Sequence, residues 1–433
     1  MNDTNKNFQY IVLGLFILFA MVGVGAFVIF GKFGGDKTGP QAQLLMWGLE
    51  PKRNIEILLD KIEERSPGLL KITYIEKEST NIDQDLLEAL ASGIGPDLIL
   101  LPHDRIWRHM DKIYTIPYDS YKQRTFKDTF LEEGEMFMRP EGIIAFPFSV
   151  DPLVMYWNRQ LFTDAGIAEV PKYWDEFFGE IIPLTELDSS RNIRQSAVAF
   201  GEYDNVNNAK EILSALILQS GDKIVDTSGA EPKIVFGART VEGPSPAESS
   251  LRFYTEFSNP TKQVYSWNKS LPTSKASFLA SDLAIYFGFA SEAGDIAAKN
   301  PNLNFDVASI PQIRDSSRAT YGRISGLSIL KNSEYIGDAF LAVNILTSEG
   351  ADLDYALGSV LPPVHRKLLS KKPSDASPAI FYDSAIISKG WFDPNKTGSD
   401  AVFEKMIENV TSGRFRIADA VIRAKEELEL LLR

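Results

Sequence analysis

The sequence predicts an α/β protein of two lobes, each built from separate stretches of the chain, behind an N-terminal transmembrane helix. Strand and helix patterns alternate from Leu44 to Leu101, which favours a parallel sheet with helical crossovers. A short apolar and aromatic run, Leu153 to Trp157, then opens a second series of elements. An almost unbroken apolar stretch from Tyr10 to Phe30 is long enough to span a membrane.

Composition limits the classes of function. The 433 residues suffice for two or three domains of about 100–200 residues each. The formal net charge of -13 argues against a nucleic-acid partner, because phosphate binding needs a basic surface. The chain has no cysteine, which excludes disulfides, thiolate metal sites, cysteine nucleophiles and a lipid-modified cysteine.

The N-terminal apolar stretch predicts an uncleaved anchor. No residue between Lys6 and Lys32 is charged. A cleavable signal peptide has a shorter apolar region of about 7–15 residues. Gly23 to Gly25 resembles a cleavage site, but the hydrophobic stretch continues through Phe30. A cleaved signal therefore remains the alternative.

The first series of elements is a regular alternation. We expect strands at Leu44–Leu49, Leu70–Ile75 and Pro96–Leu101, with helices at Pro51–Ser66 and Asp83–Ala91 between them. Ligands of parallel sheets bind beyond the carboxyl ends of the strands. This rule points to Trp47 and to the turn after the third strand.

Later elements are mixed. The segment Phe146 to Phe178 predicts a strand at Leu153–Trp157, a helix at Gln160–Ala165 and a second helix that starts near Pro171. Further helices are expected at Ala209–Ser220, Pro244–Phe257 and Asp338–Thr347, two more within Val402–Leu432, and strands at Asp282–Phe287 and Phe305–Ile310.

The segment 146–178 resembles the region of ABC-importer solute-binding proteins where the chain first crosses between lobes. The family pattern is a proline, an acidic residue, an apolar run, Tyr-Asn, Leu-Phe, Ala-Gly-Ile and Pro-x-x-Trp-Asp-Glu-Phe. The matching residues here are Pro147, Asp151, Tyr156, Asn158, Leu161, Phe162, Ala165, Gly166, Ile167, Pro171, Trp174, Asp175, Glu176 and Phe177. Trp157 is a departure, because it stands between the tyrosine and the asparagine.

The resemblance extends over roughly Ala42 to Leu432 and is most similar to the maltose-type, oligosaccharide-binding branch (family 1). Ser92 to Asp97 resembles the Gly-x-x-Pro-Asp element of the family. The stretch from Phe278 resembles Phe-x-x-Gly-Lys-x-Ala-Met, with Ser281 and Asp282 in place of the glycine and lysine.

The resemblance implies a type II periplasmic-binding-protein fold. The expected division is a tail at 1–9, the anchor at 10–31, a linker at 32–43, lobe 1 at 44–150, lobe 2 at 151–310, a return to lobe 1 at 311–335, and a return to lobe 2 with C-terminal helices at 336–433. It also implies a binding domain outside the cytoplasm that captures a small solute, with sugar favoured, and passes it to ABC permease transmembrane subunits. We expect no cofactor and no catalysis.

A sugar site needs aromatic rings for the flat faces and carboxylates for the hydroxyl groups. Aromatic residues at strand ends, in loops and in the crossing segment, and aspartates near them, are the candidates. The expected ligand-binding residues are Trp47, Asp97, Asp104, Asp151, Tyr156, Trp267, Tyr286, Phe287 and Trp391. For each of them the alternative is an ordinary structural role, as a core aromatic or as a cap or turn aspartate.

Catalytic motifs are weak. His103, His109 and His365 lack the pairing of a metalloprotease helix, and Asp36 breaks a phosphate-loop pattern near the N-terminus. Paired carboxylates remain compatible with a membrane-anchored glycoside hydrolase, which is one alternative function. A sensory binding domain without a transporter is another.

From Asp393 to Glu404 the chain has the 1, 3, 5, 6, 12 spacing of an EF-hand calcium loop. Position 5 is Thr397, however, and the usually apolar position 8 is Asp400. A helix start explains the same residues, with Thr397 as the N-cap and Asp400 three residues later. We favour the helix start and predict no metal.

Overall fold

The computed structural model describes residues 42–227, 229, 232–237 and 243–432. The expected tail at 1–9, the anchor at 10–31 and nearly all of the linker lie outside these residues. Within the described part of the chain, no helix is both long enough and apolar enough to cross a membrane.

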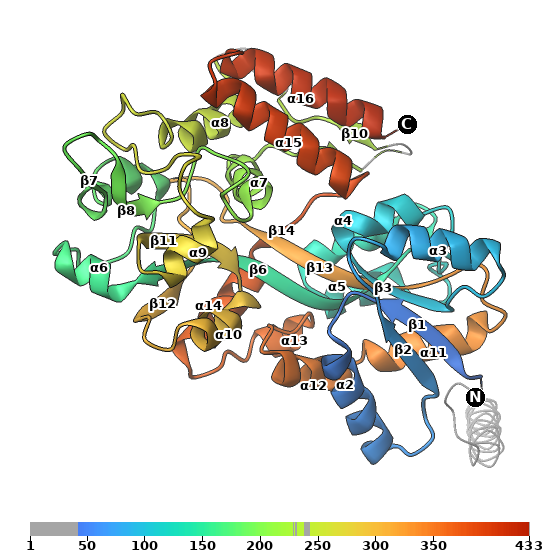
Figure 1. Cartoon of the computed structure of the whole chain (residues 1–433). Coiled ribbons are helices and arrows are strands. Elements are labelled where there is room, and N and C mark those ends of the chain that lie inside the picture. The colour runs from blue at the N-terminus through green and yellow to red at the C-terminus, as the bar shows by residue number, and fades with distance from the viewer. Residues whose placement is uncertain (1–41, 228, 230–231, 238–242, 433) are drawn as a thin grey trace, which may run out of the picture.

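One mixed sheet of ten strands runs through the molecule (Figure 1). The strand order is β2-β1-β3-β13-β6-β11-β8-β7, with β12 on β6 and β14 on β13. These strands are β1 Leu44–Gly48, β2 Ile72–Glu76, β3 Leu98–Pro102, β6 Phe146–Asn158, β7 Glu186–Leu187, β8 Ile193–Val198, β11 Leu283–Phe289, β12 Phe305–Ala308, β13 Thr320–Ile329 and β14 Ser388–Lys389. Two separate ribbons are β4 Met138–Arg139 with β5 Gly142–Ile143, and β9 Val225–Asp226 with β10 Lys233–Ile234.

The first half of the molecule surrounds β1, β2 and β3. Its helices are α2 Lys52–Arg65, α3 Ile82–Ala91, α4 His103–Ile106, α5 Gln123–Thr129, α11 Ile336–Leu346, α12 Glu349–Ser359 and α13 Arg366–Leu369, with the 3-10 helices η1 Trp107–His109 and η2 Glu132–Phe137. β1 pairs in parallel with β2 and β3, and α2 buries Ile55, Leu58 and Ile62 against this sheet. The expected strand–helix alternation is thus confirmed.

The second half surrounds β8, β11 and β12. Its helices are α6 Arg159–Asp164, α7 Ala209–Gln219, α8 Pro246–Glu256, α9 Ser274–Leu279, α10 Glu292–Lys299, α14 Ala376–Ile386, α15 Lys396–Thr411 and α16 Ile417–Leu431, with η3 Trp174–Phe178 and η4 Ile182–Leu184. The paired C-terminal helices α15 and α16, red in Figure 1, pack on α8. The helix expected from Pro171 is only the short 3-10 helix η3.

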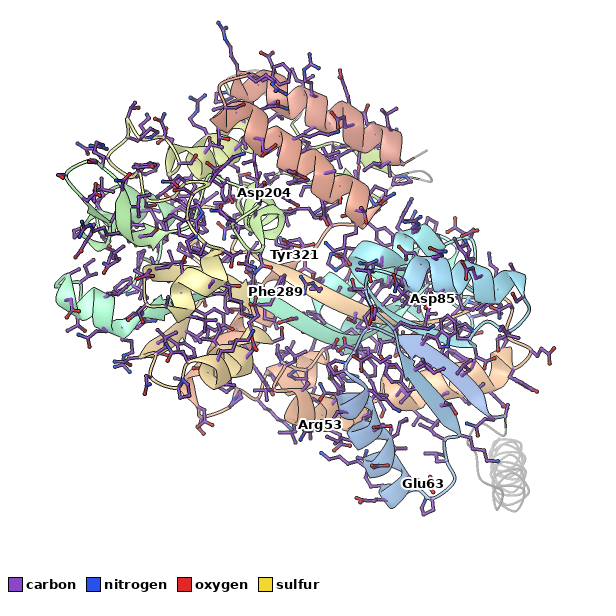
Figure 2. All side chains as sticks on the ribbon, viewed as in Figure 1. Arg53, Glu63, Asp85, Asp204, Phe289 and Tyr321 are labelled. Atoms are coloured by element: carbon purple, nitrogen blue, oxygen red, sulfur yellow. The ribbon has the colours of Figure 1, made fainter. Side chains whose placement is uncertain are left out.

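Two long strands belong to both halves. Residues Phe146–Pro152 of β6 pair with β13, and its remaining residues pair with β11 and β12. β13 in turn pairs with β14 at its start and with β3 at its end. Tyr321 and Phe289, labelled in Figure 2, lie where these strands pass between the halves, with ring centroids 6.4 Å apart. The expected crossing segment is therefore present.

The crossing strand β6 begins at Phe146, earlier than the expected Leu153. Prolines usually exclude a central strand position because they cannot donate to the ladder. Here the register between β13 and β6 shifts at Ser325 and Gly326, opposite Pro147. This irregularity accommodates the proline inside the sheet.

The helices after residue 336 divide between the halves, whereas we expected residues 336–433 to return to lobe 2. α11 packs on β13 and α12 packs on α2, both in the first half. The buried face of α11, which includes Ala339, Val343 and Leu346, covers that part of the sheet. The lobe boundaries themselves stay a prediction.

Candidate functional site

A cavity of about 520 Å³ lies on one face of the crossing strands and is lined by both halves. Six of the polar side chains in its wall come from six different places in the chain. They are Glu50 after β1, Asp104 in α4, Asp151 on β6, Ser291 before α10, Arg323 on β13 and Lys396 at the start of α15. We call it the front cavity.

Asp151 and Arg323 face each other across the antiparallel pair β6 and β13. Asp151 accepts hydrogen bonds from the backbone N–H of Ser291 (3.0 Å) and from its hydroxyl (2.6 Å). Burial raises the pKa of Asp151 to about 6, although Arg323 and the Ser291 hydrogen bonds favour its ionised form. The guanidinium of Arg323 stacks on the ring of Phe289, 3.8 Å from its centroid.

Glu50 is held by hydroxyl groups from three elements. Its Oε1 accepts from the hydroxyls of Ser149 (2.8 Å) and Ser325 (2.9 Å), and its Oε2 accepts from that of Tyr355 (2.5 Å). Glu50 was not among the expected site residues. It follows β1, at the strand end where ligands of parallel sheets bind, but the residue we expected there was Trp47.

Asp104 is 4% exposed, and its Oδ1 has no hydrogen-bond donor among the described residues. Its Oδ2 lies 3.9 Å from Nζ of Lys396, which belongs to the other half. Burial opposes ionisation of Asp104, but nearby basic side chains, including His103, Lys396 and Arg323, lower its pKa below the usual value. Asp104 is therefore an ionised acceptor at the cavity wall.

A buried lysine positions the start of α15. Nζ of Lys210 in α7 donates to Asp393 (2.9 Å), Ser399 (2.8 Å) and Asp400 (2.6 Å). Burial opposes its charge, but the Asp393 and Asp400 carboxylates raise the pKa of Lys210 above its ordinary value. This network fixes the turn that brings Lys396 to the front cavity.

The stretch with EF-hand spacing is a helix start. α15 begins at Lys396, so the sixth position of the candidate loop, Gly398, lies inside the helix. The N-cap is Asn395, whose side chain accepts from the N–H of Gly398 (3.0 Å), and not Thr397 as we expected.

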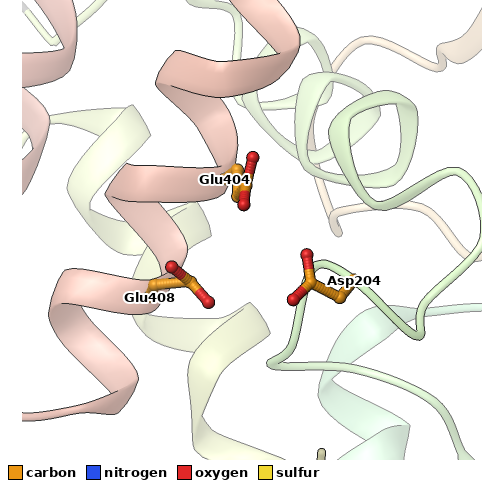
Figure 3. Close-up of side chains that lie close together, drawn as sticks. All are labelled: Asp204, Glu404 and Glu408. Carbon is orange, nitrogen blue, oxygen red and sulfur yellow. The ribbon is translucent and has the colours of Figure 1, made fainter.

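One acidic group within the described chain has the spacing of a metal site (Figure 3). Carboxylate oxygens of Asp204, Glu404 and Glu408 lie within 4.8 Å of one another. Nζ of Lys269 lies 2.6 Å from Oε1 of Glu408 and supplies a local counter-charge. We therefore assign no metal to this group.

Two of the nine expected residues, Asp104 and Asp151, come together in the front cavity. Asp97 instead accepts from the N–H of Leu45 (2.8 Å) and the hydroxyl of Ser333 (2.6 Å), which gives it a structural role in the first half. Trp47 is 7% exposed on β1, with Nζ of Lys77 3.8 Å from its ring centroid.

Four expected aromatics lie in the core of the second half. Tyr156 donates to the carbonyl of Phe289 (2.7 Å), and Tyr286 donates to Glu292 (2.8 Å). The other two are Trp267, which donates to Asn205, and Phe287, which stacks in a cluster with Phe200 and Trp174. None of these four side chains lines the front cavity. Their contact with a solute stays a prediction.

Trp391 lines a different cavity, of about 490 Å³, together with Phe392. Its indole N–H donates to the hydroxyl of Ser214 (3.2 Å), and its ring stacks on that of Phe403 with centroids 6.2 Å apart. The sequence singled out this tryptophan, but the structure separates it from Asp104 and Asp151.

Solved structures share this fold. A cyclo/maltodextrin-binding protein crystallised with maltotetraose has a TM-score of 0.69 at 15% identity, covering 89% of this chain and 96% of its own. A cyclic alpha-maltosyl-1,6-maltose binding protein from Arthrobacter globiformis has a TM-score of 0.73 at 15% identity, covering 91% and 99%. Both likenesses concern the fold.

The match to curated relatives covers a smaller share of each chain. A protein of Brucella abortus (strain 2308) that carries the provisional name of a binding protein is 20% identical over 288 residues, 66% of each chain. The chain thus spans just under two thirds of the length of the curated relatives it matches. A family model for bacterial extracellular solute-binding proteins matches residues 52–352, well over half of the chain. The protein therefore belongs to the family of bacterial extracellular solute-binding proteins.

Proposed function

We propose that the protein is the substrate-binding component of an ABC importer and captures an oligosaccharide in the front cavity. The observation that carries the proposal is the placement of this cavity. It lies on the two strands shared by both halves, and each half contributes charged side chains to its wall. The fold of the maltodextrin-binding and maltosyl-maltose-binding neighbours supports a carbohydrate as the solute.

The chemistry of the wall suits hydroxyl groups. The carboxylates of Glu50, Asp104 and Asp151 accept hydrogen bonds, while Arg323 and Lys396 donate them. The Oδ1 atom of Asp104 is buried without a donor, so a solute hydroxyl would satisfy it. The lining also includes one aromatic residue, Tyr355, and two leucines, Leu49 and Leu361.

Capture would proceed by closure of the two halves, in a type II arrangement. β6 and β13 connect the halves and act as the hinge. A solute favours the closed state only through contacts that it gains on closure. Ser291 and Lys396 from the second half, facing Asp104 and Glu50 from the first, are the groups that closure would bring onto the solute.

The binding domain would work outside the cytoplasm, as its family does. We propose that residues 10–31 anchor it to the membrane, since this stretch of the sequence is long and uncharged. The closed, loaded form would then dock on permease transmembrane subunits.

Calorimetry tests the solute assignment. The fragment from Gln41 onward is titrated with maltotetraose, maltose and a tripeptide. We expect maltotetraose to bind, and Asp151→Asn to weaken binding by about thirtyfold, roughly 2 kcal/mol, because it removes a charged acceptor from the wall. Asp97→Asn, a change of the same chemistry outside the cavity, is the control.

Three results would each reject one part of the proposal. Binding of the tripeptide with no response to either sugar would reject the carbohydrate. Breakdown of maltotetraose on long incubation, detected by thin-layer chromatography, would favour the glycoside hydrolase alternative instead. A variant without residues 1–31 that still pellets with membranes would contradict the anchor.

A further inference from the structure

The cavity that Trp391 lines lies on the opposite face of the crossing strands from the front cavity. Successive side chains of a strand point to opposite faces. On β13 the side chains of Arg323 and Ser325 face the front cavity. Gly322 faces the other way, since a Cβ built on it would lie 2.3 Å from Oε2 of Glu133. Glu133 lines this second cavity, which we call the rear cavity.

Both halves of the molecule contribute walls to the rear cavity. η2 of the first half supplies Glu133 and Met136, and the segment that follows α7 in the second half supplies 221–227. β14 and the residues after it, 388–392, close a third side. Its volume of about 490 Å³ is close to that of the front cavity.

Glu133 is the central feature of this cavity. Its side chain is 5% exposed, its Oε2 accepts from the hydroxyl of Ser388 (2.5 Å), and its Oε1 has no partner among the residues described. Burial raises the pKa of Glu133 to about 7. A buried carboxylate oxygen without a donor costs stability, so its retention calls for an explanation.

A second carboxylate in the wall of the rear cavity, that of Asp222, also has an oxygen without a hydrogen-bond donor among the described residues. This oxygen, Oδ2, is buried. Burial also raises the pKa of Asp222. Asp222 follows α7, whereas Glu133 belongs to η2, so the two half-satisfied carboxylates stand on different walls of one cavity.

The backbone leaves room around Glu133. A Cβ on Gly390 would lie 3.0 Å from Oε1 of Glu133, and one on Gly322 would collide with Oε2. Glycine at both positions allows the carboxylate to sit between the backbone of β13 and that of the segment after β14. The unpartnered oxygen thus belongs to a packed site and not to a loose surface side chain.

The charge of the wall favours a cation. Four carboxylates (Glu132, Glu133, Asp222 and Asp226) stand against two lysines (Lys223 and Lys389). One of these lysines, Lys223, is already paired with Asp226 at 3.6 Å. The remaining wall is largely apolar and includes Met136, Leu218, Ile224 and the two aromatics, which suits a short carbon chain.

We propose that the rear cavity is a second ligand site, which takes a small protonated organic amine between Glu133 and Asp222. An ammonium group has three donors and no acceptor, which matches two carboxylate oxygens that lack donors. A sugar hydroxyl is a poorer match, because it brings acceptor lone pairs as well. The site does not depend on which solute the front cavity binds.

Calorimetric titration with 1,4-diaminobutane at pH 8 tests this site, with 1,4-butanediol as the uncharged probe of equal length. We expect the diamine to bind and the diol not to bind. Glu133→Gln and Asp222→Asn should each weaken diamine binding at least tenfold. Two different variants are used so that a folding defect in one of them does not decide the result.

Matched controls separate the site from general attraction of an amine to an acidic protein. Glu404→Gln removes one carboxylate from the surface group of Figure 3, and Asp151→Asn removes one from the front cavity. Both should leave diamine affinity within twofold of the wild type. Equal weakening by Glu404→Gln and Glu133→Gln would overturn the proposal, as would no binding of the diamine. Equal binding of diol and diamine would overturn the assignment to an amine.

Discussion

The front and rear cavities lie back to back on the same two strands, but their carboxylates differ in how they are satisfied. In the front cavity Glu50 has three hydroxyl donors and Asp151 has two donors from Ser291. In the rear cavity Glu133 and Asp222 each keep one buried oxygen without a donor among the described residues. Protein donors therefore hold both oxygens of Glu50 and of Asp151 in place before any solute arrives. Glu133 and Asp222, like the third front carboxylate Asp104, each keep one oxygen without such support among the described residues.

The hydrogen bonds that a carboxylate receives from the protein determine how it contributes to stability and to ligand binding. A carboxylate whose oxygens are held by the protein presents fixed acceptors, so little conformational entropy is lost when a solute binds. A carboxylate with an unpaired oxygen costs stability until a ligand pairs it. The front cavity is thus expected to depend on its supporting network, and the rear cavity on its ligand.

The largest expected effect comes from breaking the buried Lys210 network, which fixes the start of α15 and so places Lys396 at the front cavity. Lys210→Met leaves Asp393 buried without its cation, because Asp393 is 1% exposed and bonded to Nζ of Lys210. Removal of one partner of a buried ion pair costs about 3–5 kcal/mol of unfolding free energy. Urea denaturation of the fragment from Gln41 onward measures it.

Lys396→Met is the matched control for this prediction. Its ammonium group is partly exposed, pairs with Asp400 at 3.0 Å and lies 3.9 Å from Oδ2 of Asp104. The loss should therefore be smaller than that of Lys210→Met. Equal losses in the two variants would mean that the Lys210 network does not hold α15 in place.

A smaller effect is expected from crowding the rear cavity. In Gly322→Ala the new Cβ would lie 2.3 Å from Oε2 of Glu133 and 2.6 Å from Cβ of Ser388, so β13 or the segments packed against it must shift. Overpacking of this kind costs about 1–3 kcal/mol. Thermal unfolding measures the loss, and Gly294→Ala in α10, where the added Cβ meets nothing within 4 Å, is the control.

A double variant identifies the cause of that loss. Glu133→Ala in the Gly322→Ala background removes the atoms with which the new methyl group collides. The two substitutions should therefore cost less together than the sum of their separate costs. Additive costs would show that the strain lies elsewhere, for example against Ser388.

Much of the fold was predictable because its helices and strands follow local patterns of apolar and polar residues. The three parallel strands and the helices between them follow apolar periodicities within short windows. The two helices expected within Val402–Leu432 are present as α15, which begins earlier at Lys396, and α16. The return of α11 and α12 to the first half was not predictable in this way. The apolar face of a helix does not indicate which part of the sheet it covers.

The site was harder to predict for a related reason. Glu50 is held by Ser149, Ser325 and Tyr355, which lie 99, 275 and 305 positions away in the sequence, so no local signal marks it. Trp267 stands in a polar stretch that reads as a loop, yet its ring is fully buried and its indole N–H donates to Asn205. Core aromatics and exposed aromatic platforms share the same residue types, and only packing distinguishes them.

The smallest expected effect compares the two cavities by pH. Burial raises the pKa of Glu133 to about 7 and that of Asp151 to about 6, both above the values of about 4 in an unfolded chain. The folded state therefore holds these protons more tightly, and the resulting stability is full below about pH 4 and is lost as pH rises through each folded pKa. Between about pH 6 and 8, the loss of unfolding free energy should be about 1–2 kcal/mol smaller in Glu133→Gln than in the wild type. Asp151→Asn should reduce the corresponding loss over a range roughly one pH unit lower. Urea denaturation at half-unit pH steps measures both. Identical profiles for the two variants would show that the front and rear carboxylates do not differ in the way their hydrogen bonds indicate.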